Sequence, residues 1–293
     1  MFHVICPDPL VLYAFMGSHP CIYSVPTSRP FFVYVCVPWY RGIDRAYLDC
    51  ITDHGGYPIL CANSEEEHDF YRAAGFASVF CSHNAFLDWE IYQPLSGLRR
   101  YDFVINSVLL PYKRHSLIPA GYHFAMISQP GRDELAWEPF RPAWKNDKYL
   151  AAEAVNEIYA QSKLGLILSA TEGACWSSTE YLLAGLPVIS TPAKGGREIF
   201  YNPLNSLICE PTIQSVQCSV NDALQRQWDR DQIRNDCIEL MKEHRMRFCR
   251  HLSQLAGIDG VEQLKMTFTN RLLRWFGSDD EARQYIQKFT AIP

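Results

Sequence analysis

The sequence predicts an α/β protein made of two parallel-sheet domains. Short apolar runs, rich in β-branched and aromatic residues, alternate with helix-like stretches along most of the chain. Such alternation is typical of parallel sheets that carry helices on both faces. The 293 residues are enough for two domains, and a hydrophobic content of 48% is enough for their cores. Pro94, Ser96 and Gly97, followed by two arginines, predict the boundary between the domains.

The first domain is expected to cover residues 1–97. Its buried strands are predicted at Phe2–Cys6, Phe31–Val37, Tyr57–Cys61 and Ala77–Cys81. Its helices are predicted at Ile43–Asp53 and Glu65–Ala74. Ser64 is the expected N-cap of the second helix, and Glu67 completes a capping-box pattern. Pro7–Pro30, rich in proline, glycine, serine and aromatic residues, is predicted to be irregular and partly exposed.

The second domain is expected to cover residues 98–270 and to repeat the alternation. Its strands are predicted at Phe103–Ser107, His123–Ser128, Leu164–Ser169, Pro187–Ser190 and Ser206–Cys209. Its helices are predicted at Lys148–Ser162, at Ser177–Ala184 and throughout the chain after Ile213. The aromatic and proline-containing segment Gly131–Asn146 is predicted to be a loop over the sheet edge.

Charge and composition exclude several classes of protein. The net charge is −5, from 27 basic and 32 acidic residues, which argues against nucleic-acid binding through a basic face. No run approaches 18 apolar residues, so no transmembrane span is predicted. The start of the chain lacks the charged region of a signal peptide, which predicts a cytoplasmic protein. The eleven scattered cysteines contain no Cys-x-x-Cys pair and are predicted to be reduced, with no metal site.

The most informative stretch is Leu164–Ser190. It predicts a buried strand, a tight turn at Gly173, a short helix, a stop at Gly185 and a second buried strand. Glu172 and Glu180 lie where the first strand ends and the helix begins. Ligands bind at this edge of open α/β sheets, and a helix N-terminus suits a phosphate. A phosphate cradle flanked by two acids indicates a sugar-nucleotide site.

Several motifs together resemble a known enzyme family. The pattern Glu-x7-Glu, followed by Leu-Pro-Val-Ile-Ser and by Lys194-Gly-Gly-Arg-Glu198, resembles the signature of retaining GT-B glycosyltransferases. These are the family 4-like enzymes related to glycogen synthases and bacterial mannosyltransferases. Similar likenesses occur around Ser64, at His83–Asp88, at Tyr92-Gln-Pro94 and at Pro111–Arg114. The resemblance runs from about residue 60 to about residue 210.

The resemblance implies a GT-B fold, with two Rossmann-like doubly wound parallel-sheet domains and a cleft between them. The N-terminal, acceptor-side domain (1–97) is shortened in this chain, and 98–270 is the nucleotide-sugar domain. Residues 271–293 are expected to hold a C-terminal helix, at Asp279–Phe289, that packs back toward the first domain.

The resemblance also assigns roles to residues. Lys113 and Arg114 would neutralise the diphosphate leaving group, whose charge grows in the transition state. Glu172 would position the donor sugar, and Glu180 would accept hydrogen bonds from the ribose hydroxyls. Further donor contacts are expected from Gly173, Ala174, Cys175, Trp176, Ser177, Gly195 and Gly196. No metal and no other cofactor is implied.

Each motif also has a purely structural interpretation. Glu180 fits a capping box with Ser177, and Lys113 with Arg114 fits a surface pair. Gly195 and Gly196 fit a flexible turn. Cys175 fits a small residue in a tight turn better than it fits a nucleophile.

The predicted reaction moves a hexose from a UDP- or GDP-linked sugar to a saccharide or glycoconjugate acceptor, with retention at the anomeric carbon. The shortened first domain leaves two alternatives open. One is a sugar-nucleotide-binding module that is weakly active or depends on a partner, and the other, ranked lower, is a nucleotide-sugar epimerase. A homo-oligomer or a partner subunit also stays open.

Overall fold

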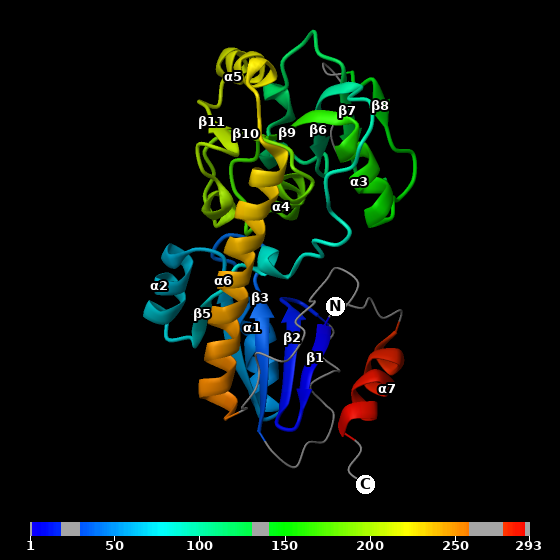
Figure 1. Cartoon of the computed structure of the whole chain (residues 1–293). Coiled ribbons are helices and arrows are strands. Elements are labelled where there is room, and N and C mark those ends of the chain that lie inside the picture. The colour runs from blue at the N-terminus through cyan, green and yellow to red at the C-terminus, as the bar shows by residue number, and fades with distance from the viewer. Residues whose placement is uncertain (1, 19–29, 131–140, 258–277, 291–293) are drawn as a thin grey trace. The chain divides into compact units, whose positions relative to one another are not determined.

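A computed structural model describes residues 2–18, 30–130, 141–257 and 278–290 (Figure 1). The chain divides into two compact units. Unit 1 contains residues 1–87 and 242–293, and unit 2 contains residues 88–241. Both units are α/β structures, as predicted. Each carries a sheet that is parallel except for one edge strand of unit 1.

Unit 1 holds a five-stranded sheet with the order β1-β2-β3-β4-β5. The strands are β1 (Phe2–Pro7), β2 (Leu10–Phe15), β3 (Phe31–Cys36), β4 (Gly56–Ala62) and β5 (Ser78–Phe80). The helices are α1 (Arg45–Asp53), α2 (Glu65–Ala73), the 3-10 turn η2 (His83–Phe86) and α7 (Asp279–Thr290). Strand β1 runs antiparallel to β2, whereas β2 to β5 are mutually parallel.

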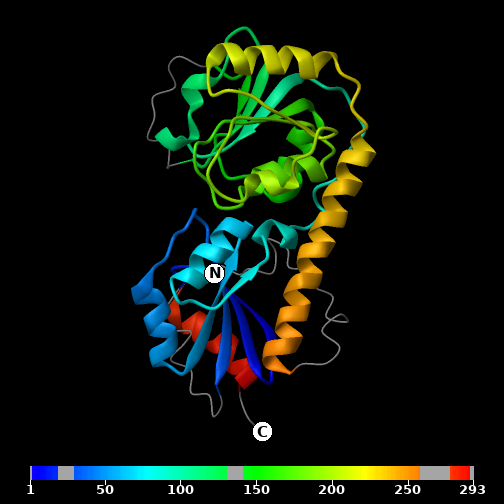
Figure 2. The same ribbon diagram turned by 90° about the vertical axis from the view of Figure 1, so that its left-hand side faces the viewer.

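The unit 1 sheet has an apolar core on each face. On one face Leu48 and Ile51 of α1 pack with Ala282 and Ile286 of α7. On the other face Phe248 and Leu252 of α6 (Arg230–Ala256) pack against residues of β2, β3 and β4. Figure 2 shows α7 and the end of α6 on opposite sides of this sheet.

Unit 2 holds a six-stranded parallel sheet with the order β11-β10-β9-β6-β7-β8. The strands are β6 (Tyr101–Asn106), β7 (Phe124–Ile127), β8 (Trp144–Lys145), β9 (Ser162–Ile167), β10 (Val188–Ser190) and β11 (Ser206–Ile208). The helices are α3 (Ala152–Ala160), α4 (Trp176–Leu183), α5 (Ile213–Gln225) and the 3-10 turns η3 (Pro111–Lys113), η4 (His115–Leu117) and η5 (Arg197–Phe200). This strand order is the doubly wound, Rossmann-like one, and it reverses between β6 and β9.

Alternating residues of β9 serve the two faces of the unit 2 sheet. Leu164 and Leu166 join Val216 and Val220 of α5 in one core. Gly165 points to the opposite face, where a Cβ would overlap the ring of Tyr181 in α4. The period of two residues along the strand thus accounts for a sheet with helices on both sides.

The division between the units differs from the expected boundaries at 97 and 270. Arg234 of α6 donates to the carbonyl oxygens of Trp89 and Tyr92, at 2.6 and 2.5 Å, and so ties this segment to unit 2. Helix α6 then continues without a break into unit 1, where its last turns enter the core. One continuous helix therefore belongs to both units. Residues 258–277 of the expected second and third segments lie outside the described residues.

Two strands differ from the sequence-based expectation. Leu10–Phe15, predicted to be irregular, forms β2, because its apolar side chains are buried beside β3. Trp144–Lys145, predicted to be part of a loop, adds the short edge strand β8 to β7. Pro7, Pro9 and Gly17 around Leu10–Phe15 obscured its apolar pattern, and the two residues of β8 are too few to show one. The remaining parts of these two predicted loops, residues 19–29 and 131–140, lie outside the described residues.

The contact between β9 and α4 predicts the effect of Gly165→Ala. The added methyl group has to displace the Tyr181 ring, and such overpacking costs about 1–3 kcal/mol. Urea unfolding of unit 2 would measure the loss. In a double-mutant cycle, Tyr181→Leu should relieve part of the cost of Gly165→Ala. Additive losses would mean that the methyl group does not meet this ring.

Candidate functional site

The candidate site lies in unit 2, where the strand order reverses between β6 and β9. The loops that leave the carboxyl ends of these two strands diverge there, and ligands of doubly wound sheets bind at this point. Asn106 ends β6 and Ser107 follows it, and the loop from Leu168 to Cys175 follows β9. Polar residues from both loops thus meet at one edge of the sheet.

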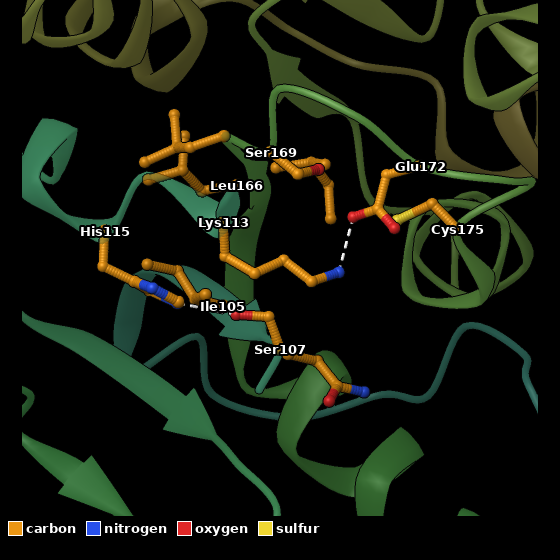
Figure 3. Close-up of a pocket in the computed structure, with 11 residues that line it drawn as sticks. Ile105, Ser107, Lys113, His115, Leu166, Ser169, Glu172 and Cys175 are labelled. Atoms are coloured by element: carbon orange, nitrogen blue, oxygen red, sulfur yellow. Dashed lines mark hydrogen bonds and ion pairs between the residues drawn. The ribbon is translucent and has the colours of Figure 1, made fainter. Parts of the chain in front are cut away.

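A pocket opens at this edge (Figure 3). Its lining combines Asn106, Ser107, Lys113 and His115 on the β6 side with Glu172 and Cys175 on the β9 side. Its cavity volume is about 10 Å³, which is close to the space that one water molecule needs. A nucleotide sugar can therefore occupy this point only if side chains at its mouth move.

The side chains that close the pocket are Lys113 and Glu172. Lys113 Nζ lies 2.5 Å from Glu172 Oε1, and these side chains are only 14% and 10% exposed. Burial lowers the pKa of Lys113, whereas the charge of Glu172 and the hydrogen bond to it raise this pKa, and the net direction is upward. The Lys113 ammonium is therefore charged at neutral pH, with Glu172 as its counter-ion.

Cys175 lines the pocket beside this pair and precedes α4. Its backbone is left-handed, with φ of 59°, which directs the chain sharply into the helix. Burial first and the nearby Glu172 second raise the pKa of Cys175 to about 12. Its sulfur is thus a neutral thiol at pH 7. It cannot act as a thiolate nucleophile or repel an incoming phosphate.

The backbone of Glu172 is fixed by the loop that follows β10. Glu172 N donates to Lys194 O at 2.9 Å, and Gly196 N donates to Gly173 O at 2.9 Å. A Cβ at Gly195, whose φ is +117°, would overlap the carbonyl oxygen of Glu172. Gly195 and Gly196 were predicted to let the backbone approach the donor. In the structure they let it approach the loop that carries Glu172.

Glu180 faces a different environment, since it is not part of the pocket lining. Its carboxylate is 5% exposed and accepts a hydrogen bond from Tyr159 Oη at 2.7 Å. Asn106 Nδ2 donates to Tyr159 Oη at 2.5 Å and lies 3.5 Å from Glu180 Oε2. The two glutamates thus do not bracket one cavity, contrary to our expectation. Asn106, which does line the pocket, is the link between them.

The capping-box interpretation of Glu180 is also wrong. Ser177 Oγ donates to the carbonyl oxygen of Asn106 at 2.8 Å and does not cap α4. Glu180 bonds to α3 and β6 instead of to the start of its own helix. Burial raises the pKa of Glu180, although hydrogen bonds from Tyr159 and Tyr92 act in the opposite direction.

Arg114 and Arg197 hold the carboxyl ends of β9 and β10. Arg114 donates to Leu168 O at 2.5 Å, to Ser169 O at 2.9 Å and to Thr191 Oγ1 at 2.7 Å. Arg197 is fully buried and donates to Ser169 Oγ at 2.7 Å and to the carbonyl oxygen of Thr191. Burial, and then the neighbouring Arg197, lower the pKa of Arg114. The Arg114 guanidinium is engaged by the strand ends and does not line the pocket.

The structure therefore brings together three of the residues predicted for the site: Lys113, Glu172 and Cys175. Gly173, Gly195 and Gly196 shape the loops behind them. Ala174 is fully buried, and Trp176 and Ser177 form the first turn of α4. Sequence reasoning missed Asn106, Ser107 and His115. The first two are polar residues at the end of a predicted strand, which was a usable signal.

His115 carried no such signal in the sequence. It is buried, and its Nε2 lies 2.7 Å from Ser107 Oγ (Figure 3). Within the described ranges, no cluster of three or more His, Cys, Asp or Glu side chains is arranged to hold a metal ion. The described helices include none that is both long and apolar enough to cross a membrane.

The raised pKa of Glu180 predicts how Glu180→Gln changes stability with pH. The folded protein disfavours the ionised carboxylate, so this group stabilises the fold below its ordinary pKa, and that stability is lost as pH rises through the folded pKa. Glutamine does not titrate. The unfolding free energy of Glu180→Gln should therefore rise relative to that of the wild type as pH increases above the ordinary pKa of a glutamate.

Urea titrations at several pH values would measure this gain. Glu157→Gln, at an exposed position of α3, controls for the loss of one negative charge. If Glu180→Gln loses stability relative to the wild type as pH rises, the carboxylate is needed in its ionised form by the fold itself.

Comparison with known proteins finds one family model, and it matches the part of the chain that carries the β9 side of the site. Residues 148–243, which include Glu172 and Glu180, match a family model described as Glycosyl transferases group 1. No curated protein matches the chain.

Solved structures resemble the chain in fold. HepE of Anabaena in complex with UDP is 12% identical with a TM-score of 0.56, over 78% of this chain and 79% of HepE. TarM is 14% identical with a TM-score of 0.54, over 93% of this chain and 56% of TarM. The N-terminal domain of Candida albicans trehalose-6-phosphate phosphatase is 11% identical with a TM-score of 0.50, over 79% of this chain and 71% of that domain. The two parallel-sheet α/β units thus have the GT-B fold that the sequence predicted.

Proposed function

We propose that this protein is a retaining glycosyltransferase that moves a hexose from a nucleoside diphosphate sugar to a saccharide-like acceptor. The observation that carries the proposal is the Lys113–Glu172 pair at the switch point of the unit 2 sheet, where Glu172 belongs to the segment that matches the Glycosyl transferases group 1 model. A cation and an acid held at this edge match the two halves of a sugar diphosphate. The complexes of HepE with UDP, and with UDP and glucose, support a UDP-linked donor.

The pair has a different partner in each state of the proposed reaction. In the free protein Lys113 and Glu172 neutralise each other. When the donor binds, Lys113 turns to the diphosphate and Glu172 accepts hydrogen bonds from hydroxyls of the sugar. Lys113 then stabilises the charge that builds on the leaving diphosphate as the bond from the anomeric carbon breaks. The acceptor oxygen bonds to the same face of that carbon and passes its proton to the departing phosphate.

Glu180 keeps its proposed contact with the ribose. Asn106 connects it to the pocket, because this residue both contacts Glu180 and lines the pocket. A ribose hydroxyl can replace Tyr159 or Asn106 as the donor to this carboxylate. Such an exchange keeps a buried acid hydrogen-bonded throughout. Arg114, engaged at four acceptors on the strand ends, contributes positive charge from behind the loop and not by contact.

The test is a panel of UDP-, GDP- and ADP-sugars incubated with the full chain. A donor at a hundred times its Kd should stabilise the protein by about 2.7 kcal/mol. Release of free nucleotide, and the anomeric configuration of the product by NMR, then report transfer. Stabilisation without turnover favours a sugar-nucleotide-binding module, and a change of the sugar without transfer favours an epimerase. No response to any donor would defeat all three functions.

Lys113→Met should separate catalysis from folding. Removing one electrostatic contact to a developing charge lowers kcat by about a hundredfold. Lys163→Met removes an exposed lysine of the same unit, which pairs with Asp102, and should leave kcat unchanged. A Lys113→Met variant that is folded and fully active would show that another group neutralises the diphosphate.

A second observation bears on the acceptor. In unit 1, the turn after β3 exposes 66% of Trp39, and β3 lies in the middle of the sheet. Gly42 N donates to Trp39 O at 3.1 Å, and a Cβ at Gly42 would overlap the indole. Arg41, with φ of 52°, donates from its backbone to Glu67 Oε1 at 2.9 Å. The turn is thus held firmly while its indole faces solvent.

An exposed indole at the carboxyl end of a parallel sheet suits the apolar face of a sugar ring. We therefore place Trp39 in the acceptor site of the proposed enzyme. Its position in the turn after β3 is independent of the residues proposed to hold the donor.

Trp39→Ala should raise KM for a saccharide acceptor about tenfold while the Kd for the donor stays unchanged. Tyr57→Ala removes a 49% exposed aromatic ring near the opposite end of the neighbouring strand and serves as the matched control. Equal effects of the two variants would exclude an acceptor site at Trp39.

A further inference from the structure

Unit 1 contains a cavity that the proposed transfer reaction does not use. Its volume is about 260 Å³. It is lined by His68 of α2, by Ser78 and Phe80 of the edge strand β5, and by Arg247, Arg250 and His251 of α6. All of these residues belong to the same compact unit.

The helical repeat explains why α6 brings three cationic or titratable side chains to this cavity. Residues 247, 250 and 251 are spaced by three and four positions, so they share one face of the helix. Phe248 and Leu252 form the adjacent face and are buried against the sheet. The core contact of α6 therefore fixes the orientation of its basic face.

The two arginines are available to a ligand. Arg247 stacks on the Phe80 ring, with Cζ 5.0 Å from the ring centroid. Its ion pair with Glu243, at 3.8 Å, is long and exposed, and such pairs are weak. Arg250 is exposed and forms no ion pair within the described part of the chain.

The two histidines are each held by one ring nitrogen. His68 Nδ1 lies 3.0 Å from Ser78 Oγ, and this hydroxyl donates its hydrogen to Leu60 O at 2.9 Å. The His68 Nδ1–H must therefore be the donor to Ser78, which leaves Nε2 for another partner. His251 Nδ1 lies 2.9 Å from Tyr34 Oη.

We propose that this cavity binds the dianionic phosphate group of a small ligand. Two guanidinium groups and two imidazoles line it, and none of its described lining residues is acidic. Arginine forks match the oxygens of a phosphate, and protonated histidines add further donors. The cavity has room beyond the phosphate, so a small phosphate ester fits as well as the free ion.

Binding of the anion should be coupled to the uptake of protons by His68 and His251. Burial first, and then Arg72 on the same helix, lower the pKa of His68, while Asp69 and Glu65 act in the opposite direction. Burial first, and then His68, lower the pKa of His251.

The other groups that face the two imidazole rings add little to the pH dependence of anion binding near neutral pH. Arg247 and Arg250 lie on the same helix as His251, and Tyr34 stays protonated because burial raises its pKa. Binding that needs the charged imidazoles must therefore strengthen as pH falls.

Calorimetric titration of the full chain tests the site with inorganic phosphate, sulfate and glucose 6-phosphate. Phosphate should bind, and Arg250→Gln should weaken its binding about tenfold. Lys242→Gln removes an exposed positive charge from the same helix outside the cavity and should change nothing. Tighter binding of glucose 6-phosphate than of phosphate assigns the site to a phosphorylated small molecule, and equal binding assigns it to the free ion.

Sulfate isolates the proton linkage because its own charge is constant near neutral pH. Its affinity should rise from about pH 8 to about pH 6, and His68→Gln should flatten this dependence. Lys113→Met should preserve the binding, which separates this site from the proposed donor site. The proposal is overturned if none of the three anions binds, or if Arg250→Gln and Lys242→Gln behave alike.

Discussion

The close approach of Gly195 to the backbone of Glu172 is the constraint on which the candidate site depends. Only a residue without a Cβ fits there, because a side chain would overlap the carbonyl oxygen of Glu172. Lys194 N donates to Ala170 O at 3.1 Å and Gly196 N to Gly173 O at 2.9 Å on either side of this contact. The loops after β9 and β10 are therefore held against each other, and this arrangement orients the Glu172 carboxylate toward Lys113.

The charge at this sheet edge is arranged in two layers. Lys113 and Glu172 form the layer that faces the pocket and cancel each other in the free protein. Behind them, Arg114 and Arg197 are held mainly by carbonyl and hydroxyl oxygens of the strand ends, with Glu198 3.7 Å from Arg197. Neutral acceptors satisfy the donors of a guanidinium without removing its charge. The edge therefore stays positive when Lys113 turns to an anion, which suits a diphosphate.

The sequence predicted the strand–turn–helix unit around Glu172 because its signals are local. Apolar runs, Gly173 and the stop at Gly185 each act within a few residues, and the family resemblance added Lys113 as a contact of the diphosphate. The buried β2 was missed because prolines and glycines surround it. Arg114 was misassigned because its partners lie just after β9 and β10, far along the chain. Asn106 stood at the end of a predicted strand and was overlooked, whereas His115 is recognised only from its contact with Ser107 in the structure. The spacing of residues predicts which chemical groups lie near one another along the chain. The direction of a side chain depends on strands that are distant in the sequence.

The two glutamates show that spacing along the sequence does not by itself determine the role of a residue. Glu172 lines the pocket, whereas Glu180 does not. Seven residues between Glu172 and Glu180 place one acid in a loop and the other in the second turn of a helix, where it turns toward α3. A buried carboxylate persists only with hydrogen-bond donors, and Tyr159 and Asn106 supply them here. The 3.5 Å distance from Asn106 Nδ2 to Glu180 marks the weaker of these two contacts, and Asn106 also lines the pocket. A ligand in the pocket can therefore affect the buried Glu180 through the neutral amide of Asn106. Glu172 would contact such a ligand directly, whereas Glu180 would be reached through Asn106.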